Sequence, residues 1–433
     1  MTLEPKIMQA VEQLNYRVTV GDVATHTGLE VNFTQQGLLA LASNANGNLQ
    51  VSESGEVVYL FPPSFRAILR NKFLRLRLQE GWEKVWRILF YLIRISFGVF
   101  LLVSIVLIVL AITLILMSGN RNSSGRGRSS YGSSGLLQSL MIRNAFFYFF
   151  AGNPYGSRGR RRPPPRNTTG GEEMNFFEAI FSFLFGDGNP NANLEDRRWA
   201  LIGTVIRNHR GAVAAEQIAP YLDLPEDNPE DEDYMLPVLV RFQGQPEVSP
   251  QGHIIYQFPQ LQTTAADTPQ QSVPAALVEQ PWKFSQASSS QVLMAIGLGA
   301  VNLVGALVLQ GLLADGAVAQ ELGGLVAFVQ SIFWLLLAYG IGFLGVPLIR
   351  YYWIQRQNHR IEQRNQQRQT YVLRLKQSDE SLQQKLRYAQ QFANQSVITS
   401  DNLTYTTEKS LLEQEAERQD AIDTEWQRRL NQE

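Results

Sequence analysis

The stretch VSESGEVVYLFP, residues Val51–Pro62, returns later in the chain as VSPQGHIIYQFP, residues Val248–Pro259. In each copy β-branched and aromatic residues flank a turn that contains glycine, which predicts a β-hairpin. Apolar residues upstream of each hairpin recur at helical spacing and predict short helices. Three helices followed by a hairpin is the order of a winged helix-turn-helix. We therefore expect two winged-helix-like modules, at residues 1–62 and 192–259.

Two further matches between the copies keep the same order. NYRVTV at Asn15 matches NHRGAV at Asn208, and VATHTGL at Val23 matches IAPYLDL at Ile218. The offset between the copies grows along the chain, as small loop insertions would produce. Three ordered matches are hard to obtain from composition alone, so we predict an internal duplication rather than a chance similarity of amphipathic helices.

Long apolar runs interrupt the soluble modules. The uncharged run Ile95–Met117 has the length needed to cross a bilayer. Residues 291–349 hold two more apolar runs, Gln291–Ala314 and Leu322–Ile349, joined by the short acidic connection DGAVAQE, and they predict a transmembrane helical hairpin. Small residues at a spacing that lets transmembrane helices approach closely are Ala295, Gly299, Ala338 and Gly342.

The segment Leu136–Gly152 decides the topology. It is apolar, but Arg143 and Asn144 lie at its centre, so it is either a weak span or an in-plane interfacial segment. Arginines follow the last span at once, and the positive-inside rule therefore places the tail and the second module on the cytoplasmic or stromal side. The first module shares that side only if residues 136–152 cross the membrane, which favours four spans.

Composition assigns the remaining segments. The N-terminus lacks the pattern of a secretory signal, so we expect the first module to stay on the side where it is made. The other expected segments are a basic amphipathic juxtamembrane helix at 63–94, a flexible linker at 118–135, an Arg/Pro-rich linker at 153–174, an aromatic interfacial helix and turn at 175–191, a Pro/Ser linker at 260–290 and an Arg/Gln-rich helical tail at 350–433.

Clustered arginines in the Arg/Pro-rich linker are the candidate binding residues of this chain. Proline holds this stretch extended, and its charge suits either a polyanion or, as the commoner use, anionic lipid headgroups. The candidates for lipid headgroup contact are Arg158, Arg160, Arg161 and Arg162.

The tail offers two interpretations. Ile354, Ile361 and Leu375 lie on one heptad track, but Arg368 and Asp379 interrupt it, which argues against a sustained coiled coil. A second helix, roughly at residues 408–430, is expected to be able to fold back on the first. The tail is then either a pair of solvated helices or a surface for self-association.

No residue pattern predicts an enzyme. The chain has no cysteine, and its four histidines show no metal-binding spacing. Walker, dinucleotide, nucleophile-elbow and zinc-protease motifs are absent from the sequence. We therefore expect no catalytic residue, no cofactor and no metal.

Winged helices most commonly bind DNA through the third helix and the wing. The charge of these two elements therefore indicates whether the modules of this chain bind DNA. The third helix of the first module, NFTQQGLLALASNANG, has no basic residue, and its wing carries Glu53 and Glu56. Acidic residues outnumber basic residues in both modules. These surfaces would repel phosphates, so we expect protein recognition rather than nucleic-acid binding.

Four features of the sequence point to a known family. They are the paired winged segments around an apolar span, the late hairpin, the Arg/Gln-rich tail and, most specifically, the stretch NFFEAIFSFLFGDGNPN at residues 175–191. Over most of its length the chain resembles a family of cyanobacterial and chloroplast integral membrane proteins, whose plant members are loosely labelled iron–sulfur cluster biosynthesis proteins. The resemblance implies a photosynthetic membrane and no established chemistry. The sequence has no cysteine and no paired histidines, so it offers no residues that could ligate an iron–sulfur cluster.

The sequence thus predicts a mainly α membrane protein with duplicated winged-helix-like (α+β) soluble modules, helical transmembrane segments and a helical C-terminal tail. The expected function is non-enzymatic docking of a membrane, stromal or cytoplasmic protein, as a scaffold or assembly factor. The expected place is a thylakoid or plasma membrane of a cyanobacterium, or a plastid membrane. The alternatives are a membrane-tethered transcription regulator and a channel or transporter subunit.

Overall fold

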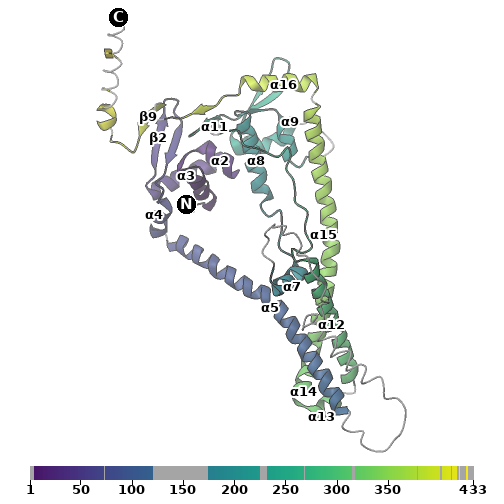
Figure 1. Cartoon of the computed structure of the whole chain (residues 1–433). Helices are drawn as coiled ribbons and strands as arrows, with labels where there is room; N and C mark the ends of the chain where they lie inside the picture. The colour runs from purple at the N-terminus through teal and green to yellow at the C-terminus, as the bar shows by residue number, and fades with distance from the viewer. Residues whose placement is uncertain are drawn as a thin grey trace, which may run out of the picture. The chain divides into compact units, whose positions relative to one another are not determined.

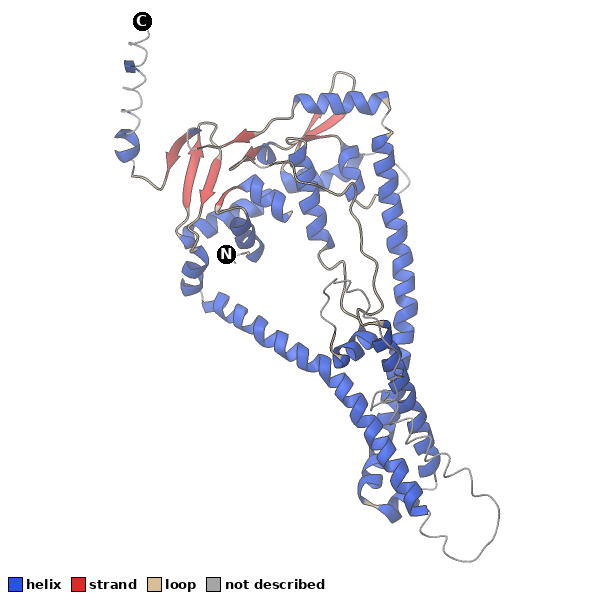
Figure 2. Ribbon diagram, viewed as in Figure 1, coloured by secondary structure: helices blue, strands red, loops and turns tan. Residues whose placement is uncertain are grey.

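The fold is described from a computed structural model in which helices predominate (Figure 1; Figure 2). It describes residues 4–72, 74–119, 174–224, 232–267, 269–314, 317–377, 379–399, 402–410, 412–416, 419 and 426–427. The chain forms two compact units, each assembled from separate stretches. Unit 1 comprises Met1–Leu89, Gly188–Lys283 and Tyr351–Glu433, and unit 2 comprises Phe90–Asp187 and Phe284–Arg350.

The first predicted module lies in unit 1 and contains the expected three helices and hairpin. Its elements are α1 (Pro5–Gln13), β1 (Arg17–Thr19), α2 (Val20–Thr27), α3 (Val31–Ala45), β2 (Asn48–Ser52) and β3 (Val57–Leu60), followed by α4 (Phe65–Lys72). β3 pairs antiparallel with both β1 and β2. Apolar residues spaced along α1, such as Ile7 and Val11, are buried and hold the helices on the sheet.

The second predicted module also lies in unit 1. Its elements are α8 (Leu194–Asn208), β4 (Ala212–Val213), α9 (Ala215–Ile218), η1 (Ala219–Tyr221), η2 (Glu232–Met235), α10 (Leu236–Phe242), β5 (Gln245–Val248) and β6 (Ile254–Gln257). β6 pairs antiparallel with β4 and β5, so the strand order β4-β6-β5 follows the pattern β1-β3-β2 of the first module. Both predicted hairpins are therefore present.

Left-handed residues recur at corresponding turns of the two modules. Before the first strand, Asn15 and Tyr16 have φ of 59° and 65°, and Arg210 and Gly211 have φ of 54° and 78°. The carbonyl oxygens of Tyr16 and Gly211 accept hydrogen bonds from the backbone N–H groups of Phe61 (2.8 Å) and Phe258 (2.7 Å), respectively.

This geometry corrects one sequence match. The pairing of Asn15 with Asn208 is displaced by two residues, because Arg210 is the residue whose backbone corresponds to that of Asn15. The sequence match aligned the asparagine and arginine that both segments contain, and it therefore placed the turn two residues too early in the second module. The later turns agree with the sequence match, since Gly55 and Gly252 have φ of 82° and 86°.

The tail adds a strand to the sheet of the first module. β9 (Leu403–Thr406) pairs antiparallel with β2, so that the sheet has the order β1-β3-β2-β9. Upstream of it lie α16 (Glu380–Gln391) and β8 (Ser396–Val397), which pairs with β7 (Thr263–Thr264). α11 (Pro259–Gln262) leads from β6 into β7. The expectation of a purely helical tail is wrong here, because β-branched and aromatic residues in LTYT favour an extended chain.

The predicted Pro/Ser linker is ordered against the helix that carries the tail. Within unit 1, Asn365 and Asn358 of α15 (Phe333–Lys376) each exchange two hydrogen bonds with backbone groups, at Glu279 and Trp282, of 2.8–3.0 Å. These asparagines are seven residues apart and lie on one face of the helix. The segment is therefore docked and is not a free linker.

Glu279 is the buried anchor of this docked segment. Its side chain is 4% exposed and accepts hydrogen bonds from Arg364 Nε (2.8 Å) and from Arg368 Nη2 (2.8 Å). Arg368, which is 2% exposed, also pairs with Asp223. Burial alone would raise the pKa of Glu279, but the hydrogen bonds from Arg364 and Arg368 outweigh it and hold the pKa below its usual value. Arg368 interrupts the heptad track because it is an ion-pair partner here.

The apolar helices lie largely in unit 2, although α5 and α15 each include residues assigned to unit 1. Three helical stretches are long and apolar enough to cross a membrane: Lys84–Ser118 within α5 (Leu74–Gly119), α12 (Ser289–Leu313) and α15. The expected span Leu322–Ile349 is interrupted, because α14 (Gly324–Ser331) ends before α15 begins. The expected connecting loop contains helix α13 (Ala317–Leu322). The predicted aromatic helix is α7 (Phe176–Phe185), and Arg350 donates to the carbonyl oxygens of Ser182 and Phe183 at its end.

Close approach of α12 and α15 depends on glycine. A Cβ at Gly299 would lie 2.5 Å from Phe343, as the small-residue pattern predicts, whereas a Cβ at Gly342 would meet nothing within 4 Å. Gly340 makes the contact instead, against Asn302 and Leu303. Asn302 is fully buried and accepts a hydrogen bond from Ser104 of α5 (2.7 Å).

Several predictions concern residues that the structure does not describe. The weak span or interfacial segment Leu136–Gly152 lies outside the described residues. The same holds for nearly all of the two linkers around it, and for the lipid headgroup candidates Arg158, Arg160, Arg161 and Arg162.

Candidate functional site

The two modules of unit 1 contact each other through α2 and α8. Glycines permit this approach: a Cβ at Gly203 of α8 would lie 3.0 Å from Thr25 Cα, and a Cβ at Gly28 would lie 2.6 Å from the backbone nitrogen of Ala200. Gly28 also needs its φ of 71°, since it ends α2 in the left-handed conformation. The C-terminal end of α2 is thereby packed against the middle of α8.

Asp22 joins the two modules at the start of α2. With Thr19 it forms a capping box, in which Asp22 N donates to Thr19 Oγ1 (3.0 Å) and Thr19 N donates to Asp22 Oδ2 (2.9 Å). The same carboxylate accepts hydrogen bonds from Arg207 Nη1 (2.6 Å), Thr264 Oγ1 (2.9 Å) and Ala265 N (3.0 Å). One helix cap is therefore also the centre of an intermodule network.

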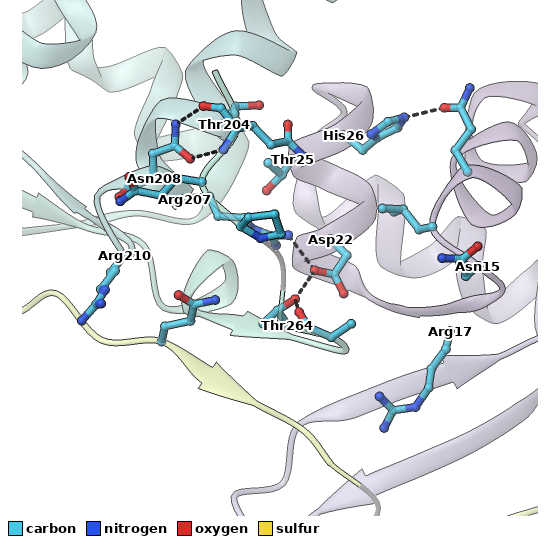
Figure 3. A pocket seen from close by; sticks show the side chains of 17 residues that line it. Asn15, Arg17, Asp22, Thr25, His26, Thr204, Arg207, Asn208, Arg210 and Thr264 are labelled. Carbon is cyan, nitrogen blue, oxygen red and sulfur yellow. Dashed lines mark hydrogen bonds and ion pairs between the residues drawn. The ribbon is translucent and has the colours of Figure 1, made fainter. Parts of the chain in front are cut away.

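A polar pocket of about 440 Å³ opens beside this network (Figure 3). The first module contributes Arg17, Thr25 and His26 to its wall, and α8 contributes Thr204 and Arg207. Figure 3 shows the Arg207 side chain extending toward Asp22 and Thr264 in the middle of the pocket. The tail reaches the wall as well, through Gln395.

His26 and Gln13 form one side of the pocket. His26 Nε2 lies 2.5 Å from Gln13 Oε1. Burial lowers the pKa of His26, which disfavours the charged imidazolium. The wall contains three arginines, Arg17, Arg207 and Arg210, and one acidic residue, Asp22, so positive side chains outnumber negative ones.

A second polar groove, of about 1020 Å³, lies beside the second module and α16. Lys385, which is 6% exposed, binds Glu216 (2.9 Å) and Glu232 (2.5 Å) in its wall. Leu236 and Ile254, from α10 and β6, form part of the same wall. The groove thus combines an ion-pair cluster with exposed apolar side chains.

The third helices of the two modules present uncharged, partly apolar surfaces. On α10, Leu236 and Val240 are 62% and 63% exposed and lie four residues apart, on one face. On α3, Phe33 and Leu39 are 46% and 45% exposed. Arg241, the one basic residue of α10, donates from Nε to the carbonyl oxygen of Gly28 (2.7 Å) and lies over the ring of Trp199.

Sequence reasoning did not predict the pocket. The sequence showed no metal-binding spacing at His26 and predicted no role for Asp22 or Arg207. The Thr-x-x-Asp spacing of Thr19 and Asp22 predicts a helix cap, but nothing local pairs it with Arg207, which lies in the other module. Among the described residues, no group of three or more histidine and acidic side chains is arranged to hold a metal ion.

Comparison with known proteins places the chain beside one curated relative. It is 37% identical, over 439 aligned positions, to a protein of Arabidopsis thaliana named "Uncharacterized protein At5g03900, chloroplastic", covering 98% of this chain and 82% of that protein. The chain belongs to the family of this chloroplastic protein. No family model matches the chain. No solved structure matches it either.

Membership of this family confirms the chloroplast part of the resemblance drawn from the sequence. The chloroplastic relative and the three long apolar helices are compatible with a plastid membrane protein. The comparisons do not bear on cyanobacterial members or on the iron–sulfur label. The relative aligns with nearly the whole chain, so the aligned region includes sequence from both compact units.

Proposed function

We propose that this protein is a non-enzymatic, membrane-anchored docking protein that holds a protein partner at a photosynthetic membrane, as a scaffold or assembly factor does. Its two modules are winged-helix-like domains that arose by duplication. They lie on the stromal or cytoplasmic side and are held there by apolar helices. The observation that carries the proposal is the uncharged, exposed apolar surface of α10, at the position where a DNA-binding winged helix needs basic side chains.

The repeated backbone supports the duplication. Corresponding left-handed turns, matching strand orders and equivalent hydrogen bonds occur in both modules. Side chains differ much more than this backbone, as expected when two copies keep a fold and change their surfaces. Short sequence matches at the hairpins agree with this interpretation.

The surface of the second module fits a protein partner with an apolar segment. Leu236 and Val240 on α10, and Val248 and Ile254 on the hairpin, are exposed apolar side chains. Exposed apolar side chains at i and i+4 suit contact with apolar groups of another protein. Arg241 is not free to neutralise a phosphate, because Gly28 and Trp199 already engage its guanidinium.

Site-specific crosslinking tests this docking surface. A photoreactive amino acid at Leu236, in the full chain in its native membrane, is expected to give a discrete adduct with one protein. Adding Val240→Asp should abolish the adduct, because a carboxylate on the same face opposes apolar contact. The matched control places the photoreactive residue at Arg360, an exposed position on α15. The same adducts from Leu236 and Arg360 would contradict the proposal.

DNA binding is the competing use of these modules and has its own test. The full chain in mild detergent, with Arg158, Arg160, Arg161 and Arg162 replaced by glutamine so that the Arg/Pro-rich linker does not bind a polyanion, is expected to cause no mobility shift of duplex DNA at low salt. Each module carries more acidic than basic residues, so low salt strengthens repulsion from phosphates. Submicromolar binding under these conditions would overturn the docking proposal in favour of a membrane-tethered transcription regulator.

A further inference from the structure

Three buried polar atoms of the intermodule pocket have no hydrogen-bond partner among the described residues. They are Nε and Nη2 of Arg207 and Oγ1 of Thr25. Both residues line the same cavity, and Thr25 is 6% exposed. Buried donors without partners are uncommon because they have lost water and gained nothing in return. Because both residues belong to the wall of one cavity, a ligand bound there could supply the missing partners.

The free edge of Arg207 has the geometry of an oxyanion receptor. Nη1 is held by Asp22, while Nε and Nη2 point their N–H groups in parallel from the other edge of the guanidinium. Such a pair matches two oxygens of one phosphate or carboxylate. The ion pair with Asp22 fixes the guanidinium, so little side-chain entropy would be lost on binding.

Asp22 does not compete for this edge. Its two oxygens already accept hydrogen bonds from Thr19, Thr264, Ala265 and Arg207. A carboxylate has about four lone-pair positions, and four donors occupy them. Arg17 and Arg210 add two further positive charges to the wall, so the pocket favours a doubly charged anion.

We propose that this pocket binds a small phosphate-bearing molecule. The phosphate lies against the Nε and Nη2 edge of Arg207 and the hydroxyl of Thr25, with Arg17 and Arg210 supplying charge. The cavity of about 440 Å³ exceeds the volume of a phosphate group, and the amide side chains of Asn15, Gln271 and Gln395 line the remainder. These amides suit hydroxyl groups, as in a sugar phosphate.

The ligand would join the two modules. Thr25 and Arg17 come from the first module, and Arg207 and Arg210 come from the second. A ligand that contacts both stabilises the arrangement in which they are packed and shifts unfolding to higher temperature by mass action. This inference does not depend on the docking surface of α10, which lies on other residues.

Thermal unfolding of the full chain in mild detergent tests the pocket. Inorganic phosphate is expected to raise the unfolding temperature more than chloride at the same ionic strength. Ribose 5-phosphate is expected to act at lower concentration than inorganic phosphate, and ribose alone is expected to have no effect. Stabilisation by ribose equal to that by ribose 5-phosphate would overturn the assignment of a phosphate site.

Two substitutions in the pocket wall test whether phosphate binds there, and a third substitution outside the pocket is the control. Arg207→Lys keeps a charge beside Asp22 but loses the parallel pair of donors, and it should raise the apparent Kd for phosphate about tenfold. Arg210→Gln alters an exposed side chain and should fold normally while weakening phosphate binding. Arg360→Gln removes an arginine outside the pocket and should leave binding unchanged. An equal response to phosphate in all three variants, or none beyond chloride in the unmodified chain, would refute the proposal.

Discussion

Replacing Glu279 with glutamine is expected to lower the free energy of unfolding of unit 1 by about 3 kcal/mol. The carboxylate is 4% exposed and lies between Arg364 and Arg368. Glutamine keeps the shape but removes the charge, which leaves Arg368, at 2% exposed, with Asp223 as its remaining anion. Denaturant unfolding of the full chain in detergent, followed by tryptophan fluorescence, measures the change, because Trp282 of the docked segment is in contact with Trp353 of α15.

A surface ion pair is the control for Glu279→Gln. Lys6 and Asp196 are 44% and 53% exposed, so Asp196→Asn should cost less than about 1 kcal/mol. The pKa of Glu279 is held below its usual value, so the stability from its pairing is present above about pH 4.3 and lost as the pH falls through the lowered pKa. Glu279→Gln should flatten this acid dependence. Equal effects of the two substitutions would show that the docked segment contributes nothing.

Replacing Gly28 with alanine is expected to separate the two modules, at a cost of about 2–5 kcal/mol. The added Cβ would lie 2.6 Å from the nitrogen of Ala200 and 2.7 Å from Trp199 Cβ, so backbone must move. The φ of 71° adds strain for any residue with a Cβ. Because the chain has no cysteine, K6C and D196C can report on the contact through a short bismaleimide crosslinker. Gly28→Ala should sharply lower the crosslinked fraction.

Gly55→Ala separates backbone strain from module contact. Gly55 has φ of 82°, but a Cβ there would meet nothing within 4 Å. The substitution should therefore cost about 1 kcal/mol through strain and leave crosslinking between the modules intact. A crosslinked fraction in Gly28→Ala equal to that in Gly55→Ala would mean that the contact at Gly28 does not hold the modules together.

Local patterns predicted the local elements well. Alternating β-branched residues in VVYLF and a glycine turn sufficed for the hairpin of the first module, and a long uncharged run sufficed for the apolar part of α5. The failures concern partners that are distant in the sequence. Residues 269–283 have the composition of a linker, yet Asn358 and Asn365 supply their hydrogen bonds, and single-sequence composition carries no record of such pairing.

The candidate site was beyond sequence reasoning for the same reason. The sequence predicts that Arg207 is a solvated arginine near the end of an amphipathic helix and that Asp22 is a helix cap. Their contact arises because Gly28 and Gly203 let two modules approach, and a glycine does not reveal whether it serves a turn or a contact. The exposed apolar face of α10 was equally hidden, because Leu236 and Val240 fit a core helix as well as a surface.

The pairing of β9 with β2 makes the first sheet dependent on the far end of the chain. Gln50, Val51 and Ser52 meet Thr406, Tyr405 and Leu403, so this edge is covered by residues that are synthesised long after the hairpin itself. A chain that is still being made, or one trimmed by a protease before Leu403, carries the sheet with an open edge that can pair with another chain. In the described residues, β9 therefore covers an edge of the first sheet that would otherwise be open to pairing.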